Sequence, residues 1–278
     1  MPSLKNIIVK SPVYLSLRKT AVFKGARKFL FYPRVTSKSG FDNVYYCCVQ
    51  KTASQWIRRI FEDPTVYKYT GLDVVPYEHL GLNEAVFDQP FPVGKVVAHL
   101  YVGFDTYDSI PKPRKSRAFF VTRDPRDAVV SWYYSAKYSH IPVYPMDEMR
   151  PKLAELDFDD GMKYVVDKLS AFGYFDAQRS WQESGEKVFR YEDLAEDHAG
   201  FIEQLLSFLE VPIPAEELQS LCDRFAFENF SGRKRGEENK FSHYRKGQPG
   251  DWKEQMSDDV YDYFARETGD LVKLLGYD

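Results

Sequence analysis

A lysine followed by hydroxyl residues stands at a predicted strand-to-helix turn, in the stretch YYCCVQKTASQW at residues 45–56. The run before it is rich in aromatic and β-branched residues, which indicates a buried strand, and WIRRIF after it indicates a helix. Backbone N–H groups converge at the start of such a helix, and the helix dipole adds partial positive charge. Lys51 would add a full charge, and Thr52 and Ser54 would add hydroxyl donors. A phosphate or sulfate site is therefore one interpretation, and an ordinary helix cap with a solvated lysine is the commoner one. The stretch is not the nucleotide triphosphate loop G-x-x-x-x-G-K-[ST], because both glycines are missing.

A second candidate anion site follows the strand-like run RAFFVT, where the chain continues RDPRDAVVSWYYSAKYSH from Arg123. Asp124 is predicted to cap a helix with Pro125 at its first position. Arg123 would then stand at the end of the strand, and Ser131 would lie two helical turns further on. A guanidinium fork and a hydroxyl suit an anion. An ion pair of Arg123 with a neighbouring aspartate explains the same residue types equally well.

Short β-rich runs alternate with helical segments along the chain, and these runs are VYYCCVQ, KVVAHL, RAFFVTR and KVFRY. This alternation predicts an α/β fold in which helices flank a central parallel sheet and ligands bind at the carboxyl ends of the strands. The 278 residues, of which 44% are hydrophobic, are enough for one large core, and no repeat or linker divides them. A single compact domain is the simpler prediction.

The net charge of −3 is unevenly distributed, because residues 1–41 carry nine Lys and Arg and no acid. We expect a basic, helical segment at 1–41 and the main domain at 42–278. The amphipathic pattern within 15–30 fits a helix packed on the domain, and a helix lying on an anionic membrane surface is the alternative. Lys and Arg interrupt every apolar run, which argues against a transmembrane span or a signal peptide. No recognised nucleic-acid motif accompanies the basic segment, so we expect no nucleic-acid partner.

Cysteine usage bears on compartment and metal binding. Cys47 and Cys48 are adjacent in a predicted strand, and Cys222 stands alone. These positions fit small buried side chains in a reducing compartment, so a cytoplasmic location is expected, with peripheral contact to a membrane as the alternative. No group of residues has metal-ligand spacing, and no metal is expected.

Four motifs in order resemble the cytosolic-type sulfotransferases that use 3′-phosphoadenosine 5′-phosphosulfate (PAPS): KTASQW, RDPRDAVVS, YEDL at 191–194 and RKGQPGDWK at 245–253. The resemblance spans about residues 45–253 and leaves out the first forty. It implies a P-loop-like sulfotransferase fold. It also implies PAPS as co-substrate and 3′-phosphoadenosine 5′-phosphate (PAP) as product.

The family's 5′-phosphosulfate loop reads P-K-S-G-T-T-W, where this chain has QKTASQW at 50–56. The resemblance implies that Lys51 stabilises the leaving phosphate oxygen and that Trp56 stacks on adenine. The chain departs from the pattern at the proline, the glycine and the second threonine. The implied loop residues are Lys51, Thr52, Ala53, Ser54, Gln55 and Trp56.

The other motifs imply a 3′-phosphate site and the rest of the adenine pocket. Arg123 and Ser131 keep the family's spacing for the 3′-phosphate, and Tyr191 matches a tyrosine that contacts adenine. Phe227 would sit opposite Trp56. The loop that closes over the 3′-phosphate matches Arg245, Lys246 and Gly247.

Sulfuryl transfer to a hydroxyl needs a base, and His99 is the candidate. It is the second-to-last residue of the run KVVAHL, at the carboxyl end of a predicted strand. A lone histidine there is more often a buried structural residue. The resemblance makes His99 the catalytic base. The family's lysine two residues before that histidine is Val97 in this chain.

The predicted function is transfer of the sulfuryl group of PAPS to a hydroxyl or amine of a small-molecule or lipid acceptor. Two alternatives remain at this point, a nucleotide-dependent phosphotransferase and a non-catalytic membrane-surface protein. The sequence leaves the acceptor and the oligomeric state open.

Overall fold

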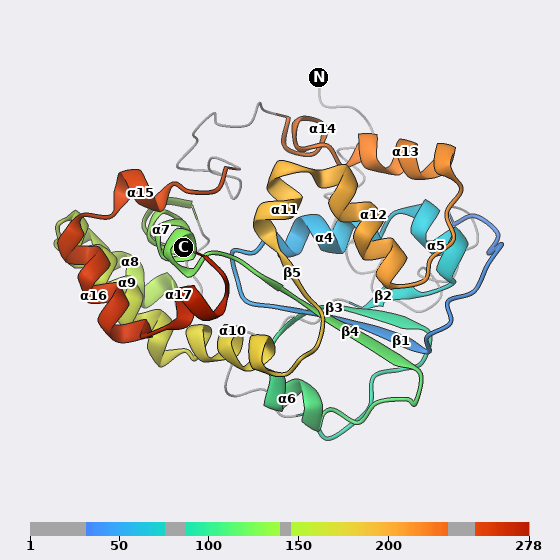
Figure 1. Cartoon of the computed structure of the whole chain (residues 1–278), viewed down its shortest axis with the longest axis horizontal. Coiled ribbons are helices and arrows are strands. Elements are labelled where there is room, and N and C mark those ends of the chain that lie inside the picture. Colours follow the sequence, from blue (N-terminus) through green and yellow to red (C-terminus); the bar gives the residue numbers. More distant parts are fainter. Residues whose placement is uncertain (1–31, 76–86, 140–145, 233–247, 278) are drawn as a thin grey trace, which may run out of the picture.

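The computed structural model describes residues 32–75, 87–139, 146–232 and 248–277. Its centre is a sheet of five strands, all parallel, in the order β2–β3–β1–β4–β5 (Figure 1). The strands are β1 (Asn43–Cys48), β2 (Asp73–Val75), β3 (Lys95–Tyr101), β4 (Ser116–Thr122) and β5 (Val188–Arg190). Four of them were predicted from the sequence. The fifth, β2, is a three-residue edge strand that the β-rich runs did not reveal.

The central strands are buried on both faces, as expected for a parallel sheet covered by helices. Alternate residues of β1 enter two different cores: Tyr45 and Cys47 pack on one face, and Tyr46 and Cys48 on the other. This alternation follows from the period of two along a strand. The predicted α/β fold with a helix-flanked parallel sheet is confirmed.

The core that contains Tyr46 joins the sheet to the helices drawn above it in Figure 1. These helices are α4 (Ser54–Phe61), α5 (Pro64–Thr70), α11 (Tyr191–Glu196), α12 (His198–Phe208), α13 (Ala215–Arg224) and α14 (Phe227–Ser231).

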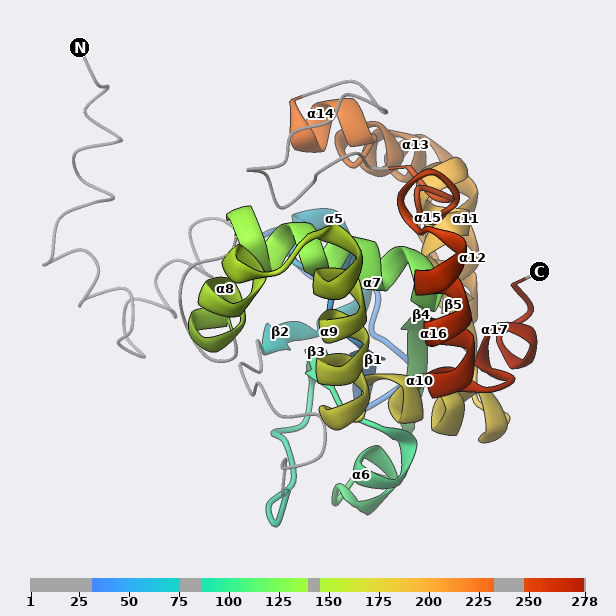
Figure 2. The ribbon, with the colours of Figure 1, turned by 90° about the vertical axis from the view of Figure 1, so that its left-hand side faces the viewer.

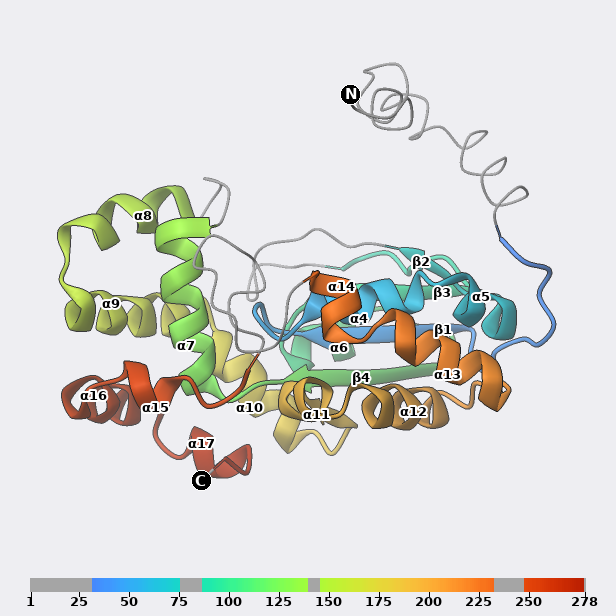
Figure 3. The same ribbon diagram turned by 90° about the horizontal axis from the view of Figure 1, so that it is seen from above.

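The core that contains Tyr45 covers the other face and continues into a group of helices beside the sheet. Figure 3 shows α7, α8, α9, α15 and α16 gathered at one end of the sheet, and Figure 2 views this group from its own side. The elements of this core are α6 (Phe104–Ser109), α7 (Pro125–Tyr134), the π-helix η1 (Ser135–Ser139), α8 (Met146–Glu155), α9 (Phe158–Ala171), α10 (Tyr174–Glu183), α15 (Trp252–Gln255), α16 (Asp258–Thr268) and α17 (Leu271–Leu274).

Local capping residues fix the start of α7, the helix that follows Arg123. The Asp124 side chain accepts a hydrogen bond from the amide of Arg126, and Pro125 occupies the first turn of α7. Both features were predicted from RDP, because an aspartate cap followed by proline fixes a helix start. Arg123 is thereby held in the short link between β4 and α7.

The expected basic segment lies mostly outside the described residues, including the whole amphipathic pattern within 15–30. Of its remainder, residues 32–41 run without helix or strand, and the amide of Ser39 donates to the carbonyl of Thr70. The boundary at residue 42 stays a prediction. Among the described helices, none is both long and apolar enough to cross a membrane.

Candidate functional site

The turn between β1 and α4 forms the first part of the site. Lys51 and Ala53 both have left-handed backbone conformations, with φ of 69° and 59°. The Thr52 hydroxyl donates to the carbonyl of Val49 at 2.7 Å, which closes the turn. Ala53 caps α4 by its backbone, since its carbonyl accepts from the amide of Trp56 at 2.9 Å. Ser54, the first residue of α4, is buried.

Arg123 lies at the end of β4, the strand next to β1, and reaches across to this turn. Its Nη1 donates to the carbonyl oxygen of Lys51 at 2.9 Å. The guanidinium lies over the ring of Tyr191 at 4.4 Å. Its Nε is buried and has no hydrogen-bond partner among the described residues. A buried guanidinium with an unused donor is suited to an anionic oxygen.

The charge of Arg123 is preserved despite its burial. Burial alone lowers the pKa of the guanidinium, but the neighbouring Tyr191 and Asp127 raise it, and the net shift is upward. No ion pair joins Arg123 to Asp124 or Asp127 in the described part of the chain. Asp124 instead pairs with Arg126 at 2.8 Å. The expectation that Arg123 is merely half of an ion pair with its neighbours therefore fails.

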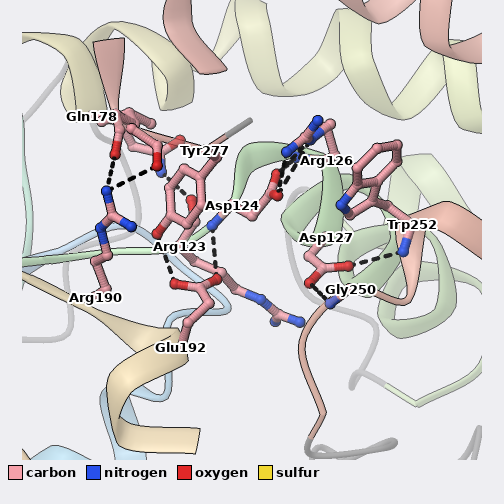
Figure 4. A network of polar contacts seen from close by, with 12 residues as sticks. Arg123, Asp124, Arg126, Asp127, Gln178, Arg190, Glu192, Gly250, Trp252 and Tyr277 are labelled. Carbon is pink, nitrogen blue, oxygen red and sulfur yellow. Dashed lines mark hydrogen bonds and ion pairs between the residues drawn. The ribbon is translucent and has the colours of Figure 1, made fainter. Parts of the chain in front are cut away.

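The half-buried carboxylate of Glu192 supports the backbone around Arg123, as Figure 4 shows. Glu192 Oε1 accepts from the amide of Asp124 at 3.0 Å, and its Oε2 accepts from the hydroxyl of Tyr277 at 2.7 Å. Gln178 Nε2 donates to the carbonyl of Arg123 at 2.8 Å. Burial raises the pKa of the Glu192 carboxyl, and these hydrogen bonds oppose that shift. The Arg123 backbone is thus held from both sides.

The arrangement of helices leaves a ligand position between β1 and β4. The helix that follows β1, α4, packs into the core that contains Tyr46, while the helix that follows β4, α7, packs into the core that contains Tyr45. The two connections therefore leave the sheet on opposite faces. Ligands of open α/β sheets bind at such a point, outside the carboxyl ends of the strands.

His99 lies inside β3, two residues before the end of the strand rather than at its end. The register between β1 and β3 shifts after Tyr46, so that Ala98 and Leu100 have partners in β1 and His99 has none. This β-bulge gives the imidazole its own direction. Its ring centroid is 4.7 Å from that of Tyr101, and its Nδ1 has no hydrogen-bond partner among the described residues.

The environment of His99 keeps its imidazole neutral. Burial, with a smaller contribution from the charge of Arg58, lowers the pKa of His99 from 6.5 to about 4. A neutral imidazole at physiological pH can accept a proton, which is what a general base requires.

Aromatic side chains form the other end of the site. The rings of Trp56 and Phe227 are neighbours, with centroids 6.1 Å apart and planes 60° from each other. The indole Nε1 of Trp56 donates to the carbonyl of Phe225 at 3.0 Å, which fixes the ring. Tyr191, the first residue of α11, is buried under Arg123.

Comparison with known proteins decides the family. A family model described as the sulfotransferase domain matches residues 106–276, which is more than half of the chain. The chain belongs to the sulfotransferase family. It is therefore a sulfotransferase, as the four sequence motifs predicted.

Curated relatives of this sulfotransferase are distant. The amine sulfotransferase of Oryctolagus cuniculus is 24% identical over 259 residues, which cover 81% of this chain and 79% of that protein. Sulfotransferase 6B1 of Danio rerio is 26% identical over 151 residues. This second match covers 52% of this chain and only about half, 48%, of that relative.

Solved structures share the fold. The mouse sulfotransferase SULT7A1, complexed with PAP, aligns with a TM-score of 0.52 at 14% identity over 85% of this chain and 86% of that one. Retinol dehydratase, in a complex with retinol and PAP, aligns with a TM-score of 0.50 at 18% identity over 92% of this chain and 86% of that one. These likenesses confirm the P-loop-like sulfotransferase fold.

The structure brings most of the expected site residues of this sulfotransferase to one edge of the sheet. The loop at 51–56 follows β1, Arg123 follows β4, and His99 lies near the end of β3. Ser131 is half-buried on α7, and Gln55 is exposed. Arg245, Lys246 and Gly247 lie outside the described residues. The buried, unpartnered Nε of Arg123 fits a phosphate oxygen, so the residues present fit PAP.

Sequence reasoning missed three supporting side chains, which are Tyr101, Gln178 and Glu192. Glu192 stands inside YEDL, the motif that singled out Tyr191, and that adjacency was the available signal. Tyr101 stands two residues after His99, and in a regular strand such a spacing places two side chains on the same face. That spacing was the available signal for Tyr101. Gln178 gives no signal, because its contact with Arg123 depends on how α10 packs. Within the described ranges, no group of three or more His, Cys, Asp or Glu could hold a metal.

Proposed function

We propose that this sulfotransferase transfers the sulfuryl group of PAPS to a hydroxyl or amine of an acceptor and releases PAP. One observation carries the proposal. The buried guanidinium of Arg123 bonds to the Lys51 carbonyl at 2.9 Å, so that two cationic turns meet where the helices after β1 and β4 diverge. A nucleotide with phosphates at its 5′ and 3′ positions needs two such anchors, and a nucleoside triphosphate does not.

Each of three residues, Lys51, His99 and Arg123, would have its own role in the transfer. PAPS would supply an activated sulfuryl group with a phosphate as leaving group. Lys51, together with the donors of the loop, would neutralise charge that develops on the leaving oxygen. His99 would accept the proton of the acceptor hydroxyl. Arg123 would hold the 3′-phosphate as a charged hydrogen-bond donor.

The remaining site residues would bind without taking part in the chemistry. Ser131 and the loop Arg245–Gly247 would complete the 3′-phosphate site. Trp56, Phe227 and Tyr191 would enclose the adenine, since aromatic faces stack on bases. Because positioning and preorganised charge supply most of the rate enhancement in group transfer, these contacts matter to rate as well as to affinity.

We further infer a small-molecule acceptor, as expected of the family. The name of the rabbit relative supports an amine as one possible acceptor group. A lipid acceptor and peripheral membrane contact through the basic segment remain hypotheses that depend on residues 1–31. All three cysteines are buried and unpaired, which supports the proposed cytoplasmic location. The family does not favour the two alternatives, a nucleotide-dependent phosphotransferase and a non-catalytic membrane-surface protein.

The test is calorimetric titration of the purified protein with PAP, 5′-AMP and ATP. We expect tight binding of PAP alone, because only PAP has a 3′-phosphate. Arg123→Ala is expected to weaken PAP binding by about 30-fold or more, since it removes a buried charged donor. Arg117→Ala is the matched control, because Arg117 is on the same strand but pairs with Glu210 at the surface. Equal or absent binding of the three nucleotides would contradict the proposal.

A further inference from the structure

The Tyr101 side chain touches both the loop at 51–56 and the candidate base. It is the last residue of β3 and is half-buried. Its hydroxyl lies 2.9 Å from Ser54 Oγ, at the start of α4. Its ring centroid lies 4.7 Å from that of His99. The side chain therefore spans the space between the loop and the base.

We propose that Tyr101 is a positioning residue for sulfuryl transfer, which orients the Ser54 hydroxyl through its own hydroxyl and the His99 imidazole through its ring. This inference rests on the proposed function, because it gives both partners of Tyr101 a role in that reaction. The tyrosine would act only through these two residues and would not touch the transferred group.

The chemistry of the two hydroxyls sets the direction of their hydrogen bond. Either hydroxyl could donate in this contact, and because the phenol is the more acidic of the two we infer that Tyr101 donates and Ser54 Oγ accepts. Burial raises the pKa of Tyr101 well above its usual value, so the phenol keeps its proton throughout the physiological range. Ser54 then keeps its own proton for an anionic oxygen. Without Tyr101, the serine hydroxyl would be free to turn toward other acceptors.

Packing, rather than hydrogen bonding, holds the His99 ring. Nδ1 is buried without a hydrogen-bond partner in the described part of the chain, so no carboxylate or carbonyl there sets the ring direction. The ring neighbours of His99 are Tyr101 at 4.7 Å and Tyr46 at 6.4 Å between ring centroids, and the charge of Arg58 also acts on the imidazole. The Tyr101 ring also keeps water away from the imidazole, which is the condition for its neutral state.

A double-mutant cycle with PAP as the probe tests the hydroxyl. We expect Tyr101→Phe and Ser54→Ala each to weaken PAP binding about 3- to 10-fold. The double variant should bind no more weakly than the worse single variant, because both changes remove the same donor arrangement. If the two residues had only a structural role, the variants would lose unfolding stability. The coupling energy between Tyr101 and Ser54 in PAP binding would then be zero.

A nuclear magnetic resonance titration of His99 tests the ring. Tyr101→Phe should keep the pKa of His99 near its wild-type value, since the ring is retained. Tyr101→Ala should raise the pKa of His99 toward the ordinary value of about 6.5, because water then reaches the imidazole. A wild-type pKa of His99 in Tyr101→Phe, together with a raised pKa in Tyr101→Ala, would show that the ring of Tyr101 and not its hydroxyl acts on His99.

Tyr69→Phe is the matched control, because Tyr69 lies on α5 and its hydroxyl donates to Glu217 of α13 at 2.6 Å, outside the site. It should keep wild-type PAP affinity. Wild-type affinity in Tyr101→Phe, or additive losses in the cycle, would overturn the inference while leaving the function intact if the wild-type protein binds PAP. A wild-type protein that does not bind PAP would overturn both.

Discussion

Ala53 occupies a backbone position that suits glycine. Its φ of 59° lies in the left-handed region, where a Cβ atom crowds the following carbonyl and costs about 1–2 kcal/mol. The sulfotransferase loop pattern has glycine at this position, so the chain keeps the conformation of the turn without the residue that adopts it most easily. The hydrogen bonds around Thr52 and the cap of α4 offset that cost.

Ala53→Gly is therefore expected to raise the free energy of unfolding by about 0.5–1 kcal/mol, after the entropy that glycine loses on folding is subtracted. Urea unfolding measures the change. Ala265→Gly, in the middle of α16, is the matched control and should lower the stability by about 1 kcal/mol. If both variants lose stability alike, the turn does not strain Ala53.

The pH dependence of stability should reveal the neutral imidazole of His99. Its pKa in the folded protein, about 4, lies below the ordinary 6.5. The stability it contributes is fully present above pH 6.5 and is lost as the pH falls toward 4, because the unfolded chain binds the proton first. Between pH 7.5 and 4.5 this loss is about 2–3 kcal/mol.

Urea unfolding of the wild type and of His99→Asn at the two pH values gives the measurement. The wild type should lose about 2–3 kcal/mol more than the variant. Identical pH dependence of the two proteins would show that the folded protein does not depress the pKa of His99.

At the scale of elements, α7 anchors the segment that leads into α15. The buried carboxylate of Asp127 accepts from the amide of Gly250 at 2.6 Å and from that of Trp252 at 2.9 Å. The guanidinium of Arg126 lies over the Trp252 ring at 3.8 Å. Arg123 lies just before the first turn of α7, and Arg126 and Asp127, which contact the 250–252 segment, lie within that turn. In the sequence, the anchored amides follow RKG by only a few residues.

Asp127→Ala should leave two half-buried amides without their acceptor and lower the free energy of unfolding by about 1–3 kcal/mol. Hydrogen exchange at Gly250 and Trp252 should become faster, and PAP should bind more weakly. Asp157→Ala, which removes the cap of α9 without contacting this segment, is the control. Unchanged exchange at the two amides would refute the anchor.

Elements were easier to predict than their pairing. The strand runs, the alternation with helices and the start of α7 at Asp124 and Pro125 all follow from local pattern, because β-branched runs and capping residues act over a few positions. The bulge at His99 and the strand β2 do not. A register shift depends on how β3 pairs with β1, and no local residue type in KVVAHL requires it.

At the scale of the molecule, the site is assembled from contacts between distant parts of the sequence. The motifs KTASQW and RDPRDAVVS predicted the positions of the two anion sites, because each motif lies within one short stretch of sequence. The side chains that support them were not predictable in the same way. Tyr101 meets Ser54 across 47 residues, and Gln178 meets Arg123 across 55. Such contacts are set by the packing of the whole chain, and a single sequence gives no direct sign of them.

The two partners of Glu192 are synthesised at different times, which affects when the site can form during translation. The Glu192 carboxylate binds the amide of Asp124, 68 residues earlier, and the hydroxyl of Tyr277, 85 residues later. A ribosome that adds about 5–20 residues per second needs about 4–17 s to synthesise those later residues. Until Tyr277 has emerged, the Glu192 carboxylate of the nascent chain lacks one of its two hydrogen-bond partners. The support of Glu192 around Arg123 is therefore complete only after Tyr277 has been synthesised, and a chain that stalls before that residue would carry the motifs without a finished site.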